Sequence, residues 1–199
     1  MDGSMEGTVV IVAGGPMEDP AYLKAELAAC RPAAVIAADG GARHLLAAGT
    51  APDFIIGDMD SLSPEERIAF ERKGSRIEIF PAAKDETDTA LALRKALAMP
   101  CREIRIYGAL GGRLDHTLAN CSLLVLAAER GVPARLLDED CEVFVVTSRR
   151  EIEGRKGQTV SVFPLSSRVT GIDLDGFDFP LRDAVMMPGN PYGVSNRLS

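Results

Sequence analysis

Residues 52–66 read Pro-Asp-Phe-Ile-Ile-Gly-Asp-Met-Asp-Ser-Leu-Ser-Pro-Glu-Glu, a stretch that holds a complete strand, loop and helix start. The mostly apolar run Asp53–Ile56 predicts a short buried strand. Ser63, followed by proline and, three residues after the serine, by Glu66, is typical of a capped helix start. The acidic loop Gly57–Ser61 lies between the two. We therefore expect a strand that delivers two carboxylates to the start of a helix.

The same alternation of strands and helices extends from this unit in both directions. It is typical of βαβ units, so we predict an α/β fold: a mostly parallel sheet with helices on both faces. The predicted strands are Thr8–Ala13, Ala34–Ala37, Asp53–Ile56, Arg76–Phe80, Glu103–Tyr107 and Ala134–Leu137, and the predicted helices include Pro20–Ala29, Ala42–Ala48, Thr87–Ala98 and His116–Arg130.

The pattern changes near Asp138–Asp140, where helical periodicity ends. Short strand-like runs separated by turn residues follow, at Cys141–Thr147, Gln158–Phe163, Arg168–Asp173 and Phe177–Leu181. We predict two domains, an α/β domain at residues 1–139 and a small antiparallel β-sandwich-like domain at residues 140–199. So short a second domain has a small core, and we expect it to lean on the first domain or on a second subunit.

The composition is that of an ordinary globular protein, with 46% hydrophobic and 26% charged residues. Asp and Glu (29) outnumber Lys and Arg (22), for a net charge of −7, and no basic stripe occurs, which argues against a nucleic-acid partner. No long apolar run predicts a membrane span, and the start of the chain lacks a basic signal region. Four widely spaced cysteines favour reduced thiols in a cytoplasmic protein.

Three acidic clusters follow predicted strands: Gly57–Ser61, Asp85–Asp88 and Gly111–His116. In α/β proteins the carboxyl ends of strands are where sites are found. Carboxylates gathered at one edge repel each other, and a hard cation such as Mg²⁺ is the natural counter-ion. A metal beside a glycine-rich, arginine-bearing loop predicts phosphate chemistry.

The candidate metal ligands differ in whether they are also expected to cap a helix. Asp58 and Asp60 have no capping duty, because a serine caps the next helix; a solvated acidic loop is the alternative. Asp85 is expected to cap the helix that follows it, whereas Asp88 can lie in the first turn and still face a ligand. Lys84 either contacts a phosphate or is solvated.

Glycine-rich strand ends predict backbone that approaches a phosphate closely. Gly111 and Gly112 precede a helix start near Asp115, and Arg113 adds a planar cationic fork. A plain turn with Asp115 as the helix cap is the alternative. Two more predicted strands end in glycines that would leave room for a nucleotide. These are Gly14 and Gly15 after the first strand, and Gly40 and Gly41, which follow Asp39, after the second.

Taken in order, these motifs resemble the thiamine pyrophosphokinase family. The matching segments are Asp39–Gly41, Pro52–Ser61, Lys84–Asp88 and Gly108–His116, with weaker matches at Gly176–Leu181 and Ser195–Asn196. The resemblance runs from about Thr8 to Asn196, which is nearly the whole chain.

The resemblance implies an α/β nucleotide-binding catalytic domain and a β domain for thiamine binding and dimerisation, working as a homodimer. It implies transfer of the pyrophosphoryl group of ATP to the hydroxyethyl oxygen of thiamine, giving thiamine diphosphate and AMP. By motif match, Asp58, Asp60 and Asp88 would hold Mg²⁺ and, with Arg113, would carry catalysis. The residues bordering ATP would be Gly14, Gly15, Asp39, Gly40, Lys84, Gly111, Gly112, Arg113 and Asp115. Thiamine would face Phe179, Ser195 and Asn196.

Two other interpretations stay open at this point. A haloacid-dehalogenase-like phosphatase would use Asp58 and Asp60, because Asp-x-Asp-Ser after an apolar strand mimics its nucleophile motif. That motif normally opens the chain, whereas here two strand–helix units precede it. The second is a non-catalytic nucleotide or thiamine sensor, which would bind both ligands without producing AMP.

Overall fold

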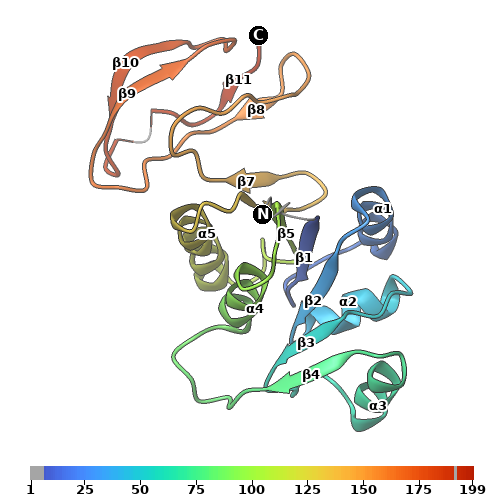
Figure 1. The fold of residues 1–199 in the computed structure, drawn as a ribbon. Helices are drawn as coiled ribbons and strands as arrows, with labels where there is room; N and C mark the ends of the chain where they lie inside the picture. The colour runs from blue at the N-terminus through green and yellow to red at the C-terminus, as the bar shows by residue number, and fades with distance from the viewer. Residues whose placement is uncertain (1–6, 191) are drawn as a thin grey trace, which may run out of the picture. The chain divides into compact units, whose positions relative to one another are not determined.

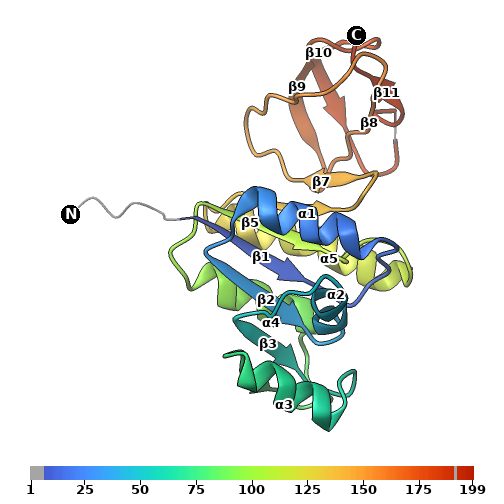
Figure 2. The same cartoon turned by 90° about the vertical axis from the view of Figure 1, so that its right-hand side faces the viewer.

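The computed structural model describes residues 7–190 and 192–199, and it divides into two compact units, Met1–Thr147 and Ser148–Ser199. The first unit contains a seven-stranded sheet of order β4-β3-β2-β1-β5-β6-β7 (Figure 1). Its strands are β1 (Thr8–Val12), β2 (Ala34–Ala38), β3 (Phe54–Gly57), β4 (Arg76–Ile79), β5 (Glu103–Tyr107), β6 (Ala134–Leu137) and β7 (Glu142–Phe144). The first six strands pair in parallel, and Figure 2 shows β1, β2 and β3 running in one direction.

The division between the units falls later than the sequence suggested. We predicted a boundary between residues 139 and 140, but β7 pairs antiparallel with β6 and so completes the large sheet. The expected strand Cys141–Thr147 is therefore shorter than predicted and belongs to the first unit.

Five helices cover both faces of the sheet, as the alternating pattern predicted. They are α1 (Pro20–Cys30), α2 (Gly41–Ala47), α3 (Pro64–Arg72), α4 (Asp88–Leu97) and α5 (Leu114–Glu129). In Figure 1, α1, α2 and α3 lie on one side of the strands and α4 and α5 on the other.

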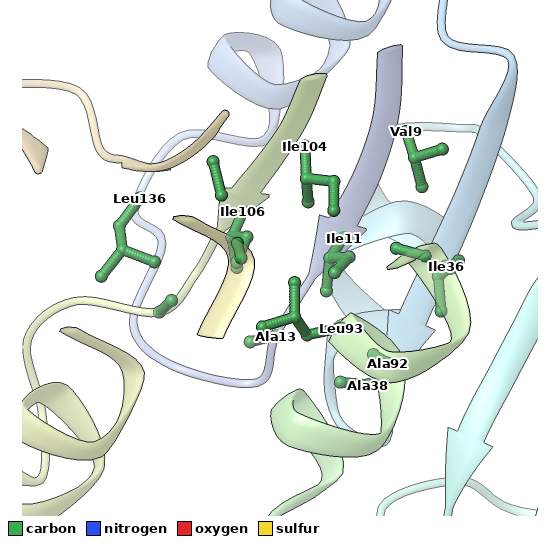
Figure 3. Packing of buried hydrophobic residues seen from close by; sticks show 14 of the residues in the cluster. Val9, Ile11, Ala13, Ile36, Ala38, Ala92, Leu93, Ile104, Ile106 and Leu136 are labelled. Carbon is green, nitrogen blue, oxygen red and sulfur yellow. The ribbon is translucent and has the colours of Figure 1, made fainter. Parts of the chain in front are cut away.

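Alternate side chains of β1 enter two separate cores. Val9 and Ile11 pack with α4 and α5 residues such as Leu93 and Leu124 (Figure 3). Val10 and Val12 pack on the opposite face with α1, α2 and α3. A strand buried on both faces is apolar throughout, and this explains why the run is continuously hydrophobic.

The helix starts test the capping predictions directly. The capping box of α3 is confirmed, because Ser63 Oγ accepts from the Glu66 amide (3.2 Å) and Glu66 Oε2 accepts from the Ser63 amide (2.8 Å). The prediction that Asp85 caps α4 is wrong: α4 begins at Asp88, and Thr87 Oγ1 accepts from the Ala90 amide (3.1 Å). A cap must directly precede its helix to reach these amides.

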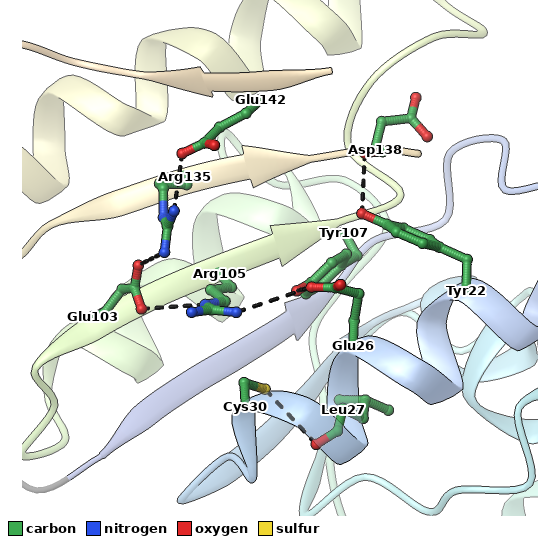
Figure 4. A network of polar contacts seen from close by, with 10 residues as sticks. All are labelled: Tyr22, Glu26, Leu27, Cys30, Glu103, Arg105, Tyr107, Arg135, Asp138 and Glu142. Atoms are coloured by element: carbon green, nitrogen blue, oxygen red, sulfur yellow. Dashed lines mark hydrogen bonds and ion pairs between the residues drawn. The ribbon is translucent and has the colours of Figure 1, made fainter. Parts of the chain in front are cut away.

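One face of β5, β6 and β7 carries charged rather than apolar side chains (Figure 4). Arg135 pairs with Glu103 and with Glu142 (3.0 Å), and Arg105 pairs with Glu103 (3.2 Å). The phenol of Tyr107 donates to Glu26 of α1 (2.8 Å), and burial raises the pKa of Tyr107. These cross-strand pairs link the three strands on this face, next to the buried ring of Tyr107.

The second unit consists of two short antiparallel strand pairs. In it, β9 (Val169–Leu174) pairs with β10 (Leu181–Met186), and β8 (Thr159–Val160) pairs with β11 (Asn196–Arg197). The predicted strand Phe177–Leu181 is wrong, because β10 only begins at Leu181. The residue before it is a proline, which cannot donate to a strand ladder. No helix among the described residues is both long and apolar enough to cross a membrane.

Candidate active site

The carboxyl ends of the parallel strands meet at one edge of the sheet, and the strand order reverses there between β1 and β5. The backbone beyond these two strands is held together, with the Ala13 amide donating to the Tyr107 carbonyl and the Gly15 amide to the Gly108 carbonyl (both 2.8 Å). A reversal of strand order is where α/β sheets open a ligand crevice. The predicted site residues of the first unit all follow strands that end at this edge.

Three aspartates of two neighbouring strands converge at this edge. One carboxylate oxygen each of Asp39, Asp58 and Asp60 lie within 4.8 Å of one another. Asp39 follows β2, and the other two follow β3. Asp39, which the sequence placed beside the nucleotide, therefore belongs to the group that can hold a cation.

The carboxylate of Asp88, which the sequence grouped with Asp58 and Asp60 as a metal ligand, is not one of these three; it lies near Asp39, across Gly57. A Cβ atom built on Gly57 would stand 2.8 Å from the Asp39 Cβ and 3.2 Å from Asp88 Oδ1, so only glycine fits between the two. Burial raises the pKa of Asp39, and the negative charges of Asp60, Asp88 and Asp58 add to that rise. Four carboxylates thus act electrostatically on one another.

One carboxylate oxygen in this cluster, Oδ1 of Asp39, is buried without a partner among the described residues. Oδ1 of Asp88 is also buried, but the Lys84 ammonium pairs with it at 2.9 Å. Unsatisfied buried oxygens are costly and call for an explanation. A hard cation that prefers oxygen ligands, such as Mg²⁺, fits this donor set.

The loop between β3 and α3 directs its acidic side chains outward by burying its apolar ones. The Met59 side chain is fully buried, in a backbone conformation with φ of 64°, and Leu62 is buried beside it. The intervening Ser61 donates its hydroxyl to Asp39 Oδ2 and lies 3.2 Å from Asp60 Oδ1. Sequence reasoning assigned no role to Ser61; its place directly after the Asp-x-Asp motif was the available signal.

The glycine-rich loop between β5 and α5 has left-handed backbone at two positions, with φ of 75° at Gly111 and 63° at Gly112. Asn120, which sequence reasoning missed, is buried and donates to the Ala109 carbonyl (2.8 Å), holding the start of the loop. Because α5 begins at Leu114, the alternative of Asp115 as its cap is wrong.

Arg113 and Asp115 form a bidentate ion pair in solvent. Nε and Nη2 of Arg113 lie 3.1 and 2.6 Å from the two carboxylate oxygens, and the side chains are 72% and 64% exposed. The hydrogen bonds from Arg113 lower the pKa of Asp115 to about 2. Within the described residues, no hydrogen bond or ion pair joins this pair to the four aspartates.

The glycines at the ends of β1 and β2 have a packing role. A Cβ atom on Gly14 would lie 3.2 Å from the Gly40 Cα, and one on Gly15 would lie 2.4 Å from the Gly108 carbonyl oxygen. His44 of α2 also contacts this backbone, with Nε2 2.8 Å from the Gly15 carbonyl oxygen. The close approach of these loops accounts for the glycines, and their contact with a nucleotide remains a prediction.

The three predicted thiamine residues of the second unit differ in exposure. Phe179 is 69% exposed, whereas Asn196 is only 6% exposed. The Asn196 side chain accepts from the Phe179 amide (3.0 Å) and donates to the Phe179 carbonyl (2.7 Å). Ser195 has a positive φ of 61°, and its amide donates to Ser161 Oγ (3.0 Å). Asn196 therefore holds the backbone of Phe179.

A cavity lies in each unit of the chain. A small one of about 60 Å³ in the second unit is lined by Leu174, Phe179, Leu181, Tyr192, Val194 and Asn196, among others. A larger one of about 410 Å³ lies at the amino ends of β1, β2 and β3, where Val9, Ala34 and Phe54 line it. The larger cavity is at the opposite edge from the aspartates, and none of the predicted site residues lines it.

Comparison with known proteins identifies the two parts of the chain separately. Residues 28–136 match the family model described as "Thiamin pyrophosphokinase, catalytic domain", and residues 145–199 match "Thiamin pyrophosphokinase, vitamin B1 binding domain". The thiamine pyrophosphokinase of Bacillus subtilis is 33% identical over 165 residues, which cover 82% of this chain and 77% of that protein. Thiamine pyrophosphokinase 2 of rice is 29% identical, over 73% of this chain and 58% of that protein.

Solved structures agree over almost the whole length. The crystal structure of thiamine pyrophosphokinase from Bacillus subtilis matches with a TM-score of 0.80 at 31% identity, covering 96% of this chain and 89% of that one. The enzyme from Geobacillus thermodenitrificans matches with a TM-score of 0.72 at 30% identity, covering 96% and 88%. Nothing in these comparisons supports a phosphatase or a sensor. With both domain models matched in order, this chain belongs to the thiamin pyrophosphokinase family.

Proposed function

We propose that this protein transfers the pyrophosphoryl group of ATP to the hydroxyethyl oxygen of thiamine, giving thiamine diphosphate and AMP. The observation that carries the proposal is the group of three aspartates, Asp39, Asp58 and Asp60, at the edge of the sheet where the strand order reverses; Oδ1 of Asp39 is buried there without a partner among the described residues. Family membership specifies the two substrates.

The aspartates would have two roles: binding a cation and accepting the proton of the alcohol. Asp39, Asp58 and Asp60 would hold Mg²⁺, with Asp88 contributing charge from behind. When bound, Mg²⁺ neutralises the developing charge on the phosphate oxygens. The alcohol needs positioning more than a strong base, and Asp60 or Asp88 would accept its proton late in the transfer.

The cationic residues of the site would bind the polyphosphate. Arg113 is exposed, and its fork, which is now occupied by Asp115, matches the geometry of a phosphate. Lys84 forms an ion pair with Asp88, and its ammonium would neutralise part of the negative charge of bound phosphates. The glycine-rich backbone at Gly111 and Gly112 would allow close approach of phosphate oxygens.

The second unit would supply the thiamine site, on a homodimer in the cytoplasm. Phe179 offers an exposed aromatic face to a flat cation, and the Asn196 side chain holds the Phe179 backbone. Ser195, the residue before Asn196, would complete the thiamine contacts. Exposed Phe163 and Leu165 on so small a unit support a subunit contact that would cover them. A solution mass of one subunit in an active preparation would contradict the homodimer.

One assay tests the reaction. The protein is incubated with ATP, Mg²⁺ and thiamine, and AMP and thiamine diphosphate are quantified in equal amounts. Phosphate release with a covalent aspartyl-phosphate would favour a phosphatase, and binding of both ligands without AMP would favour a sensor. Asp60→Asn serves as the inactive control, because Asp60 is exposed and its substitution leaves the core unchanged.

A further inference from the structure

Arg67 of α3 reaches back over the acidic loop that precedes its helix. Its Nη2 donates to the carbonyl oxygen of Met59, the residue between Asp58 and Asp60. The guanidinium is half-buried, and its Nε has no hydrogen-bond partner among the described residues. The bond to the Met59 carbonyl is therefore the side-chain hydrogen bond that fixes the position of this guanidinium.

The peptide group that links Met59 to Asp60 is fixed at both ends. Arg67 holds its carbonyl, and Asp58 Oδ1 accepts from its amide (3.2 Å). The other donor to this carbonyl, the Leu62 amide, is 3.4 Å away and so contributes a weaker bond. Rotation of this single peptide group would redirect the carboxylates on either side of it.

Met59 also needs this support for a conformational reason. Its φ of 64° is unfavourable for a residue with a side chain, and such conformations persist only where the surroundings hold them. Burial of the Met59 side chain supplies one restraint, and the Arg67 hydrogen bond supplies the second.

We propose that Arg67 is a positioning residue, which sets the directions of Asp58 and Asp60 for the cation through the Met59 carbonyl. This rests on the proposed metal site, but Arg67 itself would touch neither the cation nor a substrate. Residues that orient metal ligands from behind typically change metal affinity by about 10- to 100-fold when they are replaced.

The helix that carries Arg67 offers a matched control. The start of α3 is held by its capping box and its body by the buried Phe70, so neither depends on Arg67. Arg72 is exposed in the last turn of the same helix. Replacing either arginine by methionine therefore changes net charge and helix propensity alike, and only Arg67→Met removes the hydrogen bond to the loop.

The experiment measures Mn²⁺ affinity of the full chain by electron paramagnetic resonance, without nucleotide, because Mn²⁺ accepts the same oxygen ligands as Mg²⁺. Arg67→Met should weaken Mn²⁺ binding by about 10- to 100-fold, and Arg72→Met should bind like the parent. Amide hydrogen exchange without metal gives a second readout: residues 58–62 should exchange faster in Arg67→Met, while the β1 amides stay protected. Saturating Mg²⁺ should then restore most of kcat.

Equal Mn²⁺ affinity in Arg67→Met and Arg72→Met, or unchanged exchange at residues 58–62, would overturn the proposal. If Arg67→Met does not fold, Arg67→Lys against Arg72→Lys carries the comparison, because lysine keeps the charge and the aliphatic stem but ends one bond short of the Nη2 position that reaches the Met59 carbonyl. A parent protein that binds no Mn²⁺ would overturn the metal site and this inference together. If the parent binds Mn²⁺ and Arg67→Met binds it equally well, only the role of Arg67 is overturned.

Discussion

The aspartate cluster at the sheet edge and the Phe179–Asn196 pair in the second unit differ in how their buried polar atoms are hydrogen-bonded. In the cluster, Oδ1 of Asp39 is buried without a donor among the described residues, and burial, together with the neighbouring carboxylates, raises the pKa of Asp39. In the second unit, Asn196 is buried with its amide oxygen and nitrogen both bonded to Phe179. Polar groups left unsatisfied indicate a site that awaits a ligand, whereas satisfied ones indicate a scaffold that holds a contact residue in place.

The largest effect is expected at the aspartate cluster. Asp60→Asn should lower kcat/KM by about 10²- to 10³-fold, because it removes a charge that stabilises the transition state through the cation. The metal-free protein should melt at the same temperature or higher, since repulsion with Asp39 and Asp58 is relieved. Steady-state kinetics and a melting curve give both numbers. Asp85→Asn is the matched control at an exposed position; a kcat/KM for Asp60→Asn equal to that of the control would contradict the metal assignment.

The second prediction concerns stability rather than chemistry. Asn196→Ala should reduce the free energy of unfolding of the second unit by about 1–3 kcal/mol, because both backbone groups of Phe179 lose their partners. Hydrogen exchange of the β9 and β10 amides measures this unit separately from the first. Ser195→Ala is the neighbouring control and should change the stability by less than about 0.5 kcal/mol. Unaltered protection in Asn196→Ala would show that Asn196 is not a scaffold residue.

The third prediction separates contact from scaffold. Phe179→Ala should leave stability within about 0.5 kcal/mol, since the ring is mostly exposed. It should raise KM for thiamine about 2- to 30-fold with a smaller change in kcat, the range expected for losing a cation–π contact. Met187→Ala, at another exposed apolar position of the same unit, is the comparison. The thiamine role of Phe179 fails if both variants have the same KM.

The smallest effect on stability is expected at the exposed pair of Arg113 and Asp115. Because Arg113 lowers the Asp115 pKa to about 2, Arg113→Lys should move that pKa upward, toward the ordinary carboxyl value. Because the Asp115 pKa is lowered, any stability that the pair contributes is fully present at neutral pH and is lost as the pH falls toward about 2. Both side chains are exposed and screened by solvent, so that contribution is small and the melting temperature at neutral pH should change little. Carboxyl NMR titration reads the pKa directly. An unmoved Asp115 titration would mean that the bidentate pair does not persist in solution; Arg72→Lys is the control that should not move it.

Local chemistry made much of this molecule predictable. The strand at Phe54–Gly57 and the capping box of α3 follow from neighbouring residues, and the structure confirms both. Errors arose where neighbouring signals competed: Thr87, not Asp85, caps α4, and β10 starts after Pro180 rather than before it. In both places the sequence held the correct signal beside the misleading one.

The sequence by itself determined the α/β class, the order of its motifs and, through their resemblance, the family and reaction. Only the tertiary structure brought Asp39 to Asp58 and Asp60, because strand order is not local information. Once β2 lies beside β3, the parallel register pairs Ala38 with Ile56, and the residues that follow these two strands must meet. Likewise, only folding placed Arg67 on the Met59 carbonyl and Asn196 behind Phe179. These contacts depend on how the backbone turns after each strand, which no run of residues specifies alone.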